Sequence, residues 1–160
     1  VPVTRAALPL GADHFRYHGD ETKTAEARRG AGGTFGDIGY LDDDGYLYLT
    51  DRKSFTINAG GVNIYPQEIE DVLLTHPAVH DVAVFGLPND EYGEQVKAVV
   101  EPDPAVVADD ALAAGLLAHC RTKLAGYKVP RSIDFEQRLP REPTGKLRKH
   151  LIRDRYLPDR

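Results

Sequence analysis

The spacing of apolar residues changes along the chain, and each change predicts a different element. Residues 1–35 show weak periodicity and are rich in Gly, Ala and Arg, so this segment is not expected to hold a stable fold alone. The polar turn Asp42–Gly45 precedes Tyr46–Leu49, which has strand propensity. A further short strand is predicted over Phe55–Asn58, and it ends at the glycine pair Gly60–Gly61.

The rest of the chain mixes helical and strand patterns. Pro66 suits a first helical turn, and Ile69, Val72 and Leu73 follow on one face, so a helix is predicted that ends near His76. The elements predicted after it are a strand over 79–85, a wide loop over 86–93, an antiparallel strand over 95–100, a helix capped at 109–110 and reaching 124, a strand over 132–135, and a basic helix from about 146 to 156.

This mixture predicts an α+β fold. We expect a small domain with a short two-stranded hairpin and a mainly antiparallel three-stranded sheet flanked by helices. At 160 residues with 41% apolar content, the chain can bury one modest core beside a short segment of a neighbouring domain. It begins with Val1 and contains neither a run long enough to span a bilayer nor a secretory signal. We therefore expect a soluble, cytoplasmic piece of a longer protein.

Charge is distributed unevenly. Residues 1–120 hold 8 Lys and Arg against 20 Asp and Glu, whereas residues 121–160 hold 12 against 5. Leu147, Leu151 and Ile152 recur at helical spacing within the basic part, which favours a folded basic face over a nucleic-acid-binding tail. A phosphorylated small molecule is the expected ligand.

Three familiar motifs do not fit. Thr144–Lys146 lacks the glycine and the hydroxyl residue of a P-loop, because Pro140 and Leu147 stand at those positions. The acidic turn around Gly45 puts a tyrosine at the first ligand position of a calcium loop, and the six histidines lack metal-ligand spacing. The single Cys120 cannot form an internal disulfide and is expected to be a buried helical residue.

Four segments together carry a more specific signal, and their order and spacing both matter. They are Gly36–Asp42, Asp51–Lys53, Gly60–Glu70 and Leu139–Lys146. With these segments the chain resembles the acyl-CoA synthetases of the adenylate-forming superfamily. The stretch Val84–Asp90 with Gly93 and Glu94 resembles the same ligases, so the likeness covers about residues 15 to 156. It implies that residues 1–50 end a large N-terminal domain and that residues 51–160 form a C-terminal lid domain.

The resemblance implies roles for three charged residues. Asp37 corresponds to the carboxylate that accepts hydrogen bonds from the ribose hydroxyls of ATP, and Arg52 to a guanidinium near the ribose and phosphate. Lys146 corresponds to the adenylation lysine, which stabilises negative charge between the acyl carboxylate and the α-phosphate. The competing interpretations are a turn-capping aspartate, a surface arginine and an ordinary basic residue at a helix start.

Other positions follow from the same resemblance. Gly60 and Gly61 match glycines that let the pantetheine arm of CoA approach the acyl-adenylate, although a turn that requires positive φ also explains them. Ser54 stands at the hinge position, where relatives commonly carry a charged residue. Asn58 replaces a lysine that some relatives use in the second half-reaction, so that role is not assigned. Lys128 and Arg131 could meet CoA phosphates, but a solvated basic face explains them equally well.

The implied activity is ligation of a carboxylic acid to CoA through an acyl-adenylate, with ATP, CoA and Mg²⁺ as cofactors. Mg²⁺ would be bound mainly by the missing N-terminal domain, which is also the expected partner; no nucleic acid and no transmembrane segment is expected. Fatty acids rank ahead of aryl acids, and the fragment alone is expected to be inactive. Two alternatives remain: loading of a carrier-protein phosphopantetheine, and a non-catalytic binding module with the same fold.

Overall fold

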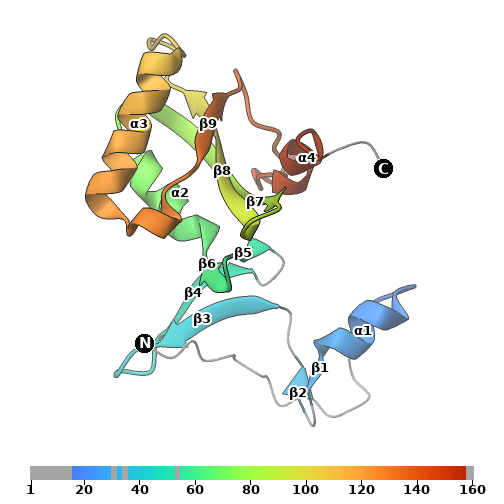
Figure 1. Cartoon of the computed structure of the whole chain (residues 1–160). Coiled ribbons are helices and arrows are strands. Elements are labelled where there is room, and N and C mark those ends of the chain that lie inside the picture. Colours follow the sequence, from blue (N-terminus) through green and yellow to red (C-terminus); the bar gives the residue numbers. More distant parts are fainter. Residues whose placement is uncertain (1–15, 30–31, 34–35, 53–54, 158–160) are drawn as a thin grey trace. The chain divides into compact units, whose positions relative to one another are not determined.

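The computed structural model describes residues 16–29, 32–33, 36–52 and 55–157. The chain divides into two compact units, Val1–Ser54 and Phe55–Arg160. Each unit is described by itself below (Figure 1).

The described part of the first unit is small and built from local contacts. Its helix α1 is capped by Asp20, whose carboxylate accepts from the N–H of Lys23 at 2.8 Å. The strands β3 and β4 form an antiparallel hairpin, and the Asp42 carboxylate accepts from the N–H groups of Asp44 and Tyr46 to close its turn. The predicted turn and strand are thus confirmed. The elements are α1 (Glu21–Ala27), β1 (Arg28–Arg29), β2 (Gly32–Gly33), β3 (Asp37–Leu41) and β4 (Leu47–Arg52).

The second unit is a five-stranded mixed sheet with helices on it. The strand order is β6-β5-β8-β7, and β9 pairs in parallel with β8 while the other pairs are antiparallel. The strands are β5 (Ile57–Ala59), β6 (Val62–Ile64), β7 (Val79–Asn89), β8 (Gly93–Pro102) and β9 (Ser132–Phe135), and the helices are α2 (Pro66–Leu74), α3 (Asp110–Lys123), the 3-10 turn η2 (Gly126–Lys128) and α4 (Lys149–Asp154).

The alternation of residues along β8 builds two cores. Val96, Ala98 and Val100 are buried with residues of α2 and α3, whereas Val99 is buried with Ile152 of α4. Successive side chains of a strand point to opposite faces, so α2 and α3 cover one face of the sheet and α4 covers the other (Figure 1). Cys120 is fully buried in the first core, as expected, and burial raises the pKa of its thiol.

The predicted α+β class is confirmed, and so are the start of α2 at Pro66 and the cap of α3 at Asp109, which accepts from the N–H of Leu112 at 2.8 Å. The wide loop predicted over 86–93 is wrong, because β7 continues to Asn89 and β8 begins at Gly93. Pro88 is tolerated there since β7 is an edge strand.

The last helix is also shorter than predicted. It begins at Lys149, and Lys146 lies in the preceding loop rather than at a helix start. The cause is a turn at Gly145, whose φ of +85° is incompatible with a right-handed helix, followed by a bridge that pairs Leu147 with Arg141.

Candidate functional site

Lys146 follows a tight turn whose backbone is closed by two hydrogen bonds. The C=O of Glu142 accepts from the N–H of Gly145 at 2.8 Å, and the N–H of Glu142 donates to the C=O of Lys146 at 2.9 Å. Pro143 favours the first turn position and Gly145 adopts the left-handed conformation, as in a three-residue hairpin loop. Lys146 is exposed, and its ammonium group has no hydrogen bond or ion pair within the part of the chain that the structure describes.

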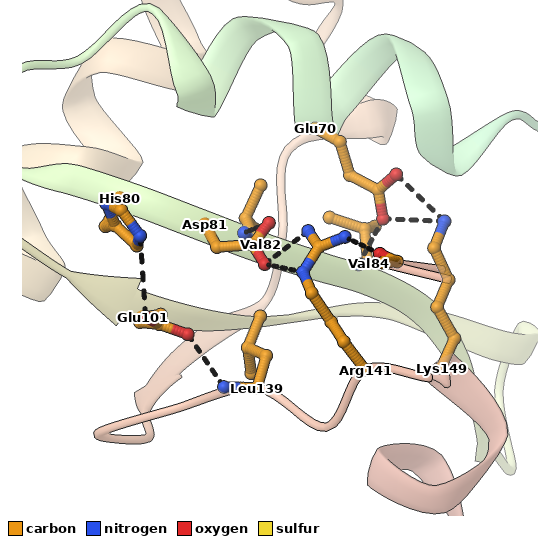
Figure 2. Close-up of polar contacts among 10 residues, drawn as sticks. Glu70, His80, Asp81, Val82, Val84, Glu101, Leu139, Arg141 and Lys149 are labelled. Atoms are coloured by element: carbon orange, nitrogen blue, oxygen red, sulfur yellow. Dashed lines mark hydrogen bonds and ion pairs between the residues drawn. The ribbon is translucent and has the colours of Figure 1, made fainter. Parts of the chain in front are cut away.

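An arginine clamp holds this turn against the sheet. The guanidinium of Arg141 donates twice to Oδ2 of Asp81 on β7, with Nε at 2.9 Å, and once to the C=O of Gly145 (Figure 2). The Asp81 side chain is only 14% exposed, whereas that of Arg141 is 45% exposed. The Arg141 guanidinium therefore ties Gly145, the residue before Lys146, to a carboxylate on β7 that is mostly shielded from solvent.

A second ion pair anchors the chain three residues after Lys146. Nζ of Lys149 lies 2.7 Å from Oε1 and 2.8 Å from Oε2 of Glu70 on α2, and Oε1 also accepts from the N–H of Val84 at 2.7 Å (Figure 2). The side chains of Lys149 and Glu70 are 12% and 7% exposed, so the carboxylate is buried and the ammonium group is largely shielded from solvent. Lys146, which has no partner within the described ranges, thus lies between two anchored positions, Arg141 and Lys149.

Gly60 and Gly61 form the two-residue loop between β5 and β6. Their φ angles of +60° and +81° are those of a type I′ hairpin turn, which favours glycine at both positions. The N–H of Gly60 donates to the C=O of Tyr92 at 2.8 Å. The turn requirement alone therefore explains both glycines.

A groove of about 560 Å³ lies beside this loop. Its lining includes Ala59 and Tyr92 together with Arg121 and Arg131, and the Arg131 guanidinium stands 5.7 Å from the centre of the Tyr92 ring. Lys128 is not part of the lining, because its ammonium pairs with Glu68 at 2.6 Å. Sequence reasoning named Arg131 but missed Tyr92 and Arg121, for which the sequence offers no signal.

The Lys146 turn and the Gly60–Gly61 loop lie at opposite ends of the β7–β8 ribbon. Arg141 holds the turn near Asp81, which pairs with Glu101, whereas the loop contacts Tyr92 next to the Asn89–Gly93 pair. Strand residues rise about 3.3 Å each, so the two places are separated by roughly 25 Å. A small substrate cannot contact both at once.

The remaining candidates belong to the first unit. Asp37 and Arg52 are partners in the β3–β4 register, so the hairpin brings these two positions side by side. Asp37 is half-buried, and the side chain of Arg52 lies outside the described residues, as does Ser54 altogether. No group of three or more possible metal ligands gathers within the described ranges. None of the described helices is both long and apolar enough to cross a membrane.

Comparison with known proteins gives a consistent result. Residues 68–146 match the family described as AMP-binding enzyme C-terminal domain. The chain is 44% identical to long-chain-fatty-acid–CoA ligase FadD13 of Mycobacterium tuberculosis over 76% of its own length and 23% of that protein. It is 44% identical to feruloyl-CoA synthase of an Amycolatopsis species over 88% of the chain and 28% of that protein.

The fold of this chain is also similar to that of a solved structure. ATP-bound MatB from Rhodopseudomonas palustris superposes with a TM-score of 0.77 at 34% identity, over 84% of this chain and 26% of that one. The chain therefore spans about a quarter of the length of the proteins it matches.

Proposed function

Because this chain carries the C-terminal domain of an AMP-forming acyl-CoA synthetase, we propose that the protein containing it activates a carboxylic acid with ATP and transfers the acyl group to CoA. The observation that carries the proposal is Lys146, an exposed lysine that has no partner among the described residues and follows a turn anchored on both sides.

In the first half-reaction a carboxylate oxygen attacks the α-phosphorus of ATP. A bond forms between them, the bond from the α-phosphorus to the bridging oxygen breaks, and pyrophosphate leaves. Lys146 supplies a fixed positive charge to the acyl carboxylate and the α-phosphate while negative charge develops. The clamp by Arg141 matters because a preorganised charge needs no rearrangement at the moment of reaction.

In the second half-reaction the sulfur of CoA attacks the acyl carbon, the bond from that carbon to the phosphate oxygen breaks, AMP leaves, and the thiol proton is released to solvent. We propose that Gly60 and Gly61 flank the path of the pantetheine arm and that the groove beside Tyr92 receives the nucleotide end of CoA. Arg121 and Arg131 line this groove and could pair with phosphates, while the Glu94 carboxylate in the same lining is already engaged by Asn58 and Arg153. The exposed Tyr92 ring offers an apolar surface.

The separation of about 25 Å between the two places favours sequential use. The lid domain, proposed as residues 51–160, would present the Lys146 turn first and the Gly60–Gly61 loop afterwards. Ser54 would absorb the change of backbone angles between these orientations. Residues 1–50 would belong to the large domain.

Nucleotide binding involves the first unit in this proposal. Asp37 would accept from the ribose hydroxyls, with Arg52 beside it in the same hairpin. Mg²⁺ would arrive with ATP and be held by the rest of the larger protein. The proposed location is the cytoplasm, where ATP and CoA are both available.

Fatty acids remain the first proposed substrate class, with aryl acids as the alternative, since the relatives include a long-chain-fatty-acid–CoA ligase and a feruloyl-CoA synthase. The pocket that selects the acid would lie outside this chain. A carrier-protein phosphopantetheine is the second candidate acceptor, because its arm is the same as that of CoA.

The test uses the full-length protein that contains this chain, with ATP, Mg²⁺, CoA and a panel of fatty and aryl acids. Formation of AMP, pyrophosphate and acyl-CoA is expected. Release of ADP and phosphate would contradict the adenylate route, and acylation of a carrier protein without acyl-CoA would favour the second acceptor. Failure to consume ATP with any acid would favour a non-catalytic module.

A further inference from the structure

Glu94 connects three elements that lie far apart in sequence. Its Oε2 accepts from the backbone N–H of Asn58 on β5 at 2.8 Å, and its Oε1 lies 3.4 Å from the Arg153 guanidinium on α4. Arg153 also donates from Nε to the C=O of Gly86 on β7 at 2.9 Å. The carboxylate thus joins the hairpin of β5 and β6 to the β7–β8 ribbon and to α4.

Gly86 leaves room for this carboxylate. A Cβ atom at position 86 would stand 2.8 Å from Oε1 and 2.9 Å from Cδ of Glu94, so any side chain there would displace the group. Gly86 and Glu94 both belong to the sequence stretch that resembles the ligases, and Glu94 also lines the groove beside Tyr92. Their shared contact gives a physical reason for both residues.

The β5–β6 hairpin has few main-chain attachments to the sheet. Among the described residues, β5 pairs with β8 only through Ala59 and Gly93, and the Gly60 N–H donates to Tyr92. Glu94 adds the bond to Asn58, directly beside the Ala59 pair. Buried Ile57 and Ile64 hold the hairpin to the core, but apolar packing is non-directional, whereas a charge-assisted hydrogen bond fixes distance and direction.

We propose that Glu94 is a positioning residue for acyl transfer, which holds the Gly60–Gly61 loop at the angle that the pantetheine arm of CoA requires. This role rests on the proposed function of the loop. Arg153 supports it by holding the carboxylate, and Gly86 by leaving space for it. Lys146 lies at the other end of the ribbon, so adenylation does not depend on this contact.

The test compares three variants of the full-length protein. Glu94→Gln keeps the size of the side chain but replaces one of the two oxygens by an NH2 group, which cannot accept from Asn58 or from Arg153. Arg153→Gln removes the supporting cation. Glu136→Gln is the matched control, because Glu136 pairs with Arg155 at 2.7 Å and contacts no part of the hairpin in the described structure.

Two half-reactions are measured separately: pyrophosphate exchange into ATP for adenylation, and thioester formation from preformed acyl-adenylate and CoA. In Glu94→Gln we expect thioester formation to fall on the order of 10-fold, because one charged hydrogen bond is weakened. Adenylation and the melting temperature should stay near the wild-type values. Arg153→Gln should show a smaller loss in the same step, and Glu136→Gln none.

Hydrogen exchange of the Asn58 and Gly60 amides in the same proteins gives a readout that does not depend on activity. Faster exchange in Glu94→Gln together with normal thioester formation would overturn the positioning role. An equal loss in both half-reactions with a lower melting temperature would make Glu94 merely structural, which also overturns it. If the wild-type protein consumes no ATP, the proposed function fails. Independently of activity, unchanged exchange of the Asn58 amide in Glu94→Gln would refute the contact between Glu94 and Asn58.

Discussion

Replacement of Lys149 by Met tests how firmly the chain after the Lys146 turn is anchored. The substitution keeps the length of the side chain and removes the ammonium group that lies 2.7 and 2.8 Å from the two Glu70 oxygens. Because Glu70 is buried and the Lys149 side chain is only 12% exposed, the carboxylate loses its charged partner where little water can replace it. Breaking such a pair costs about 3 kcal/mol of unfolding free energy. For a unit of this size, that lowers the melting temperature by about 12 °C.

The assay is urea unfolding of the 160-residue chain, followed by far-ultraviolet circular dichroism. The matched control is Lys128→Met, since Lys128 pairs with Glu68 on the same helix, but the partner is 44% exposed. That control should lose under about 1 kcal/mol. The double variant Glu70→Gln with Lys149→Met should recover part of the loss because no charge remains buried. Equal, small losses in Lys149→Met and Lys128→Met would refute the reasoning.

Three further predictions concern other parts of the same unit. Arg141→Gln should slow adenylation on the order of 10-fold in the full-length protein, because the turn loses its ion pair with Asp81. In a protein that already carries Lys146→Ala, Arg141→Gln should slow adenylation no further. An additional loss in that double variant would contradict the clamp. Burial, and then the neighbouring His119 ring, lower the pKa of His76 below its ordinary 6.5. The unfolded chain therefore binds a proton more readily at this residue, and stability should decrease as pH falls below 6.5. The urea midpoint of His76→Asn should depend less on pH than that of the wild type, and an equal pH dependence would contradict the role of His76. Cys120 should react with a thiol reagent on the order of 1000-fold more slowly in the native chain than in urea, because its thiol is buried and burial raises the thiol pKa. Equal reaction rates in the two conditions would contradict the burial of Cys120.

Most of the elements could be predicted from sequence because local signals determined them. Pro66 marked the start of α2, Asp109 capped α3, and the apolar run Val79–Phe85 identified a strand, although β7 lies at the edge of the sheet and not inside it. The prediction failed where tertiary context overrode local preference. The residues after Phe85 suggested a loop, yet β7 continues because an edge strand accepts Pro88.

The candidate site divides in a similar way. The turn before Lys146 reflects Pro143 and Gly145, whose preferences are local. The clamp between Arg141 and Asp81 joins residues 60 positions apart, and no spacing rule connects them. The groove beside Tyr92 arises from segments brought together only by folding. The family resemblance assigned Lys146 to the reaction, but the ion pairs that anchor its turn, Arg141–Asp81 and Lys149–Glu70, are visible only in the structure.

The central claim is that the unit Phe55–Arg160 takes part in adenylation through the Lys146 turn and in thioester formation through the Gly60–Gly61 loop. Its most direct test is a crossed comparison of Lys146→Ala and Gly60→Asn in the full-length protein, with Gly45→Asn as control, because asparagine tolerates the positive φ that both glycines adopt. We predict that Lys146→Ala abolishes pyrophosphate exchange and spares thioester formation from preformed acyl-adenylate. Gly60→Asn should do the reverse, and Gly45→Asn should change neither. Equal loss of both steps in either Lys146→Ala or Gly60→Asn would contradict the account.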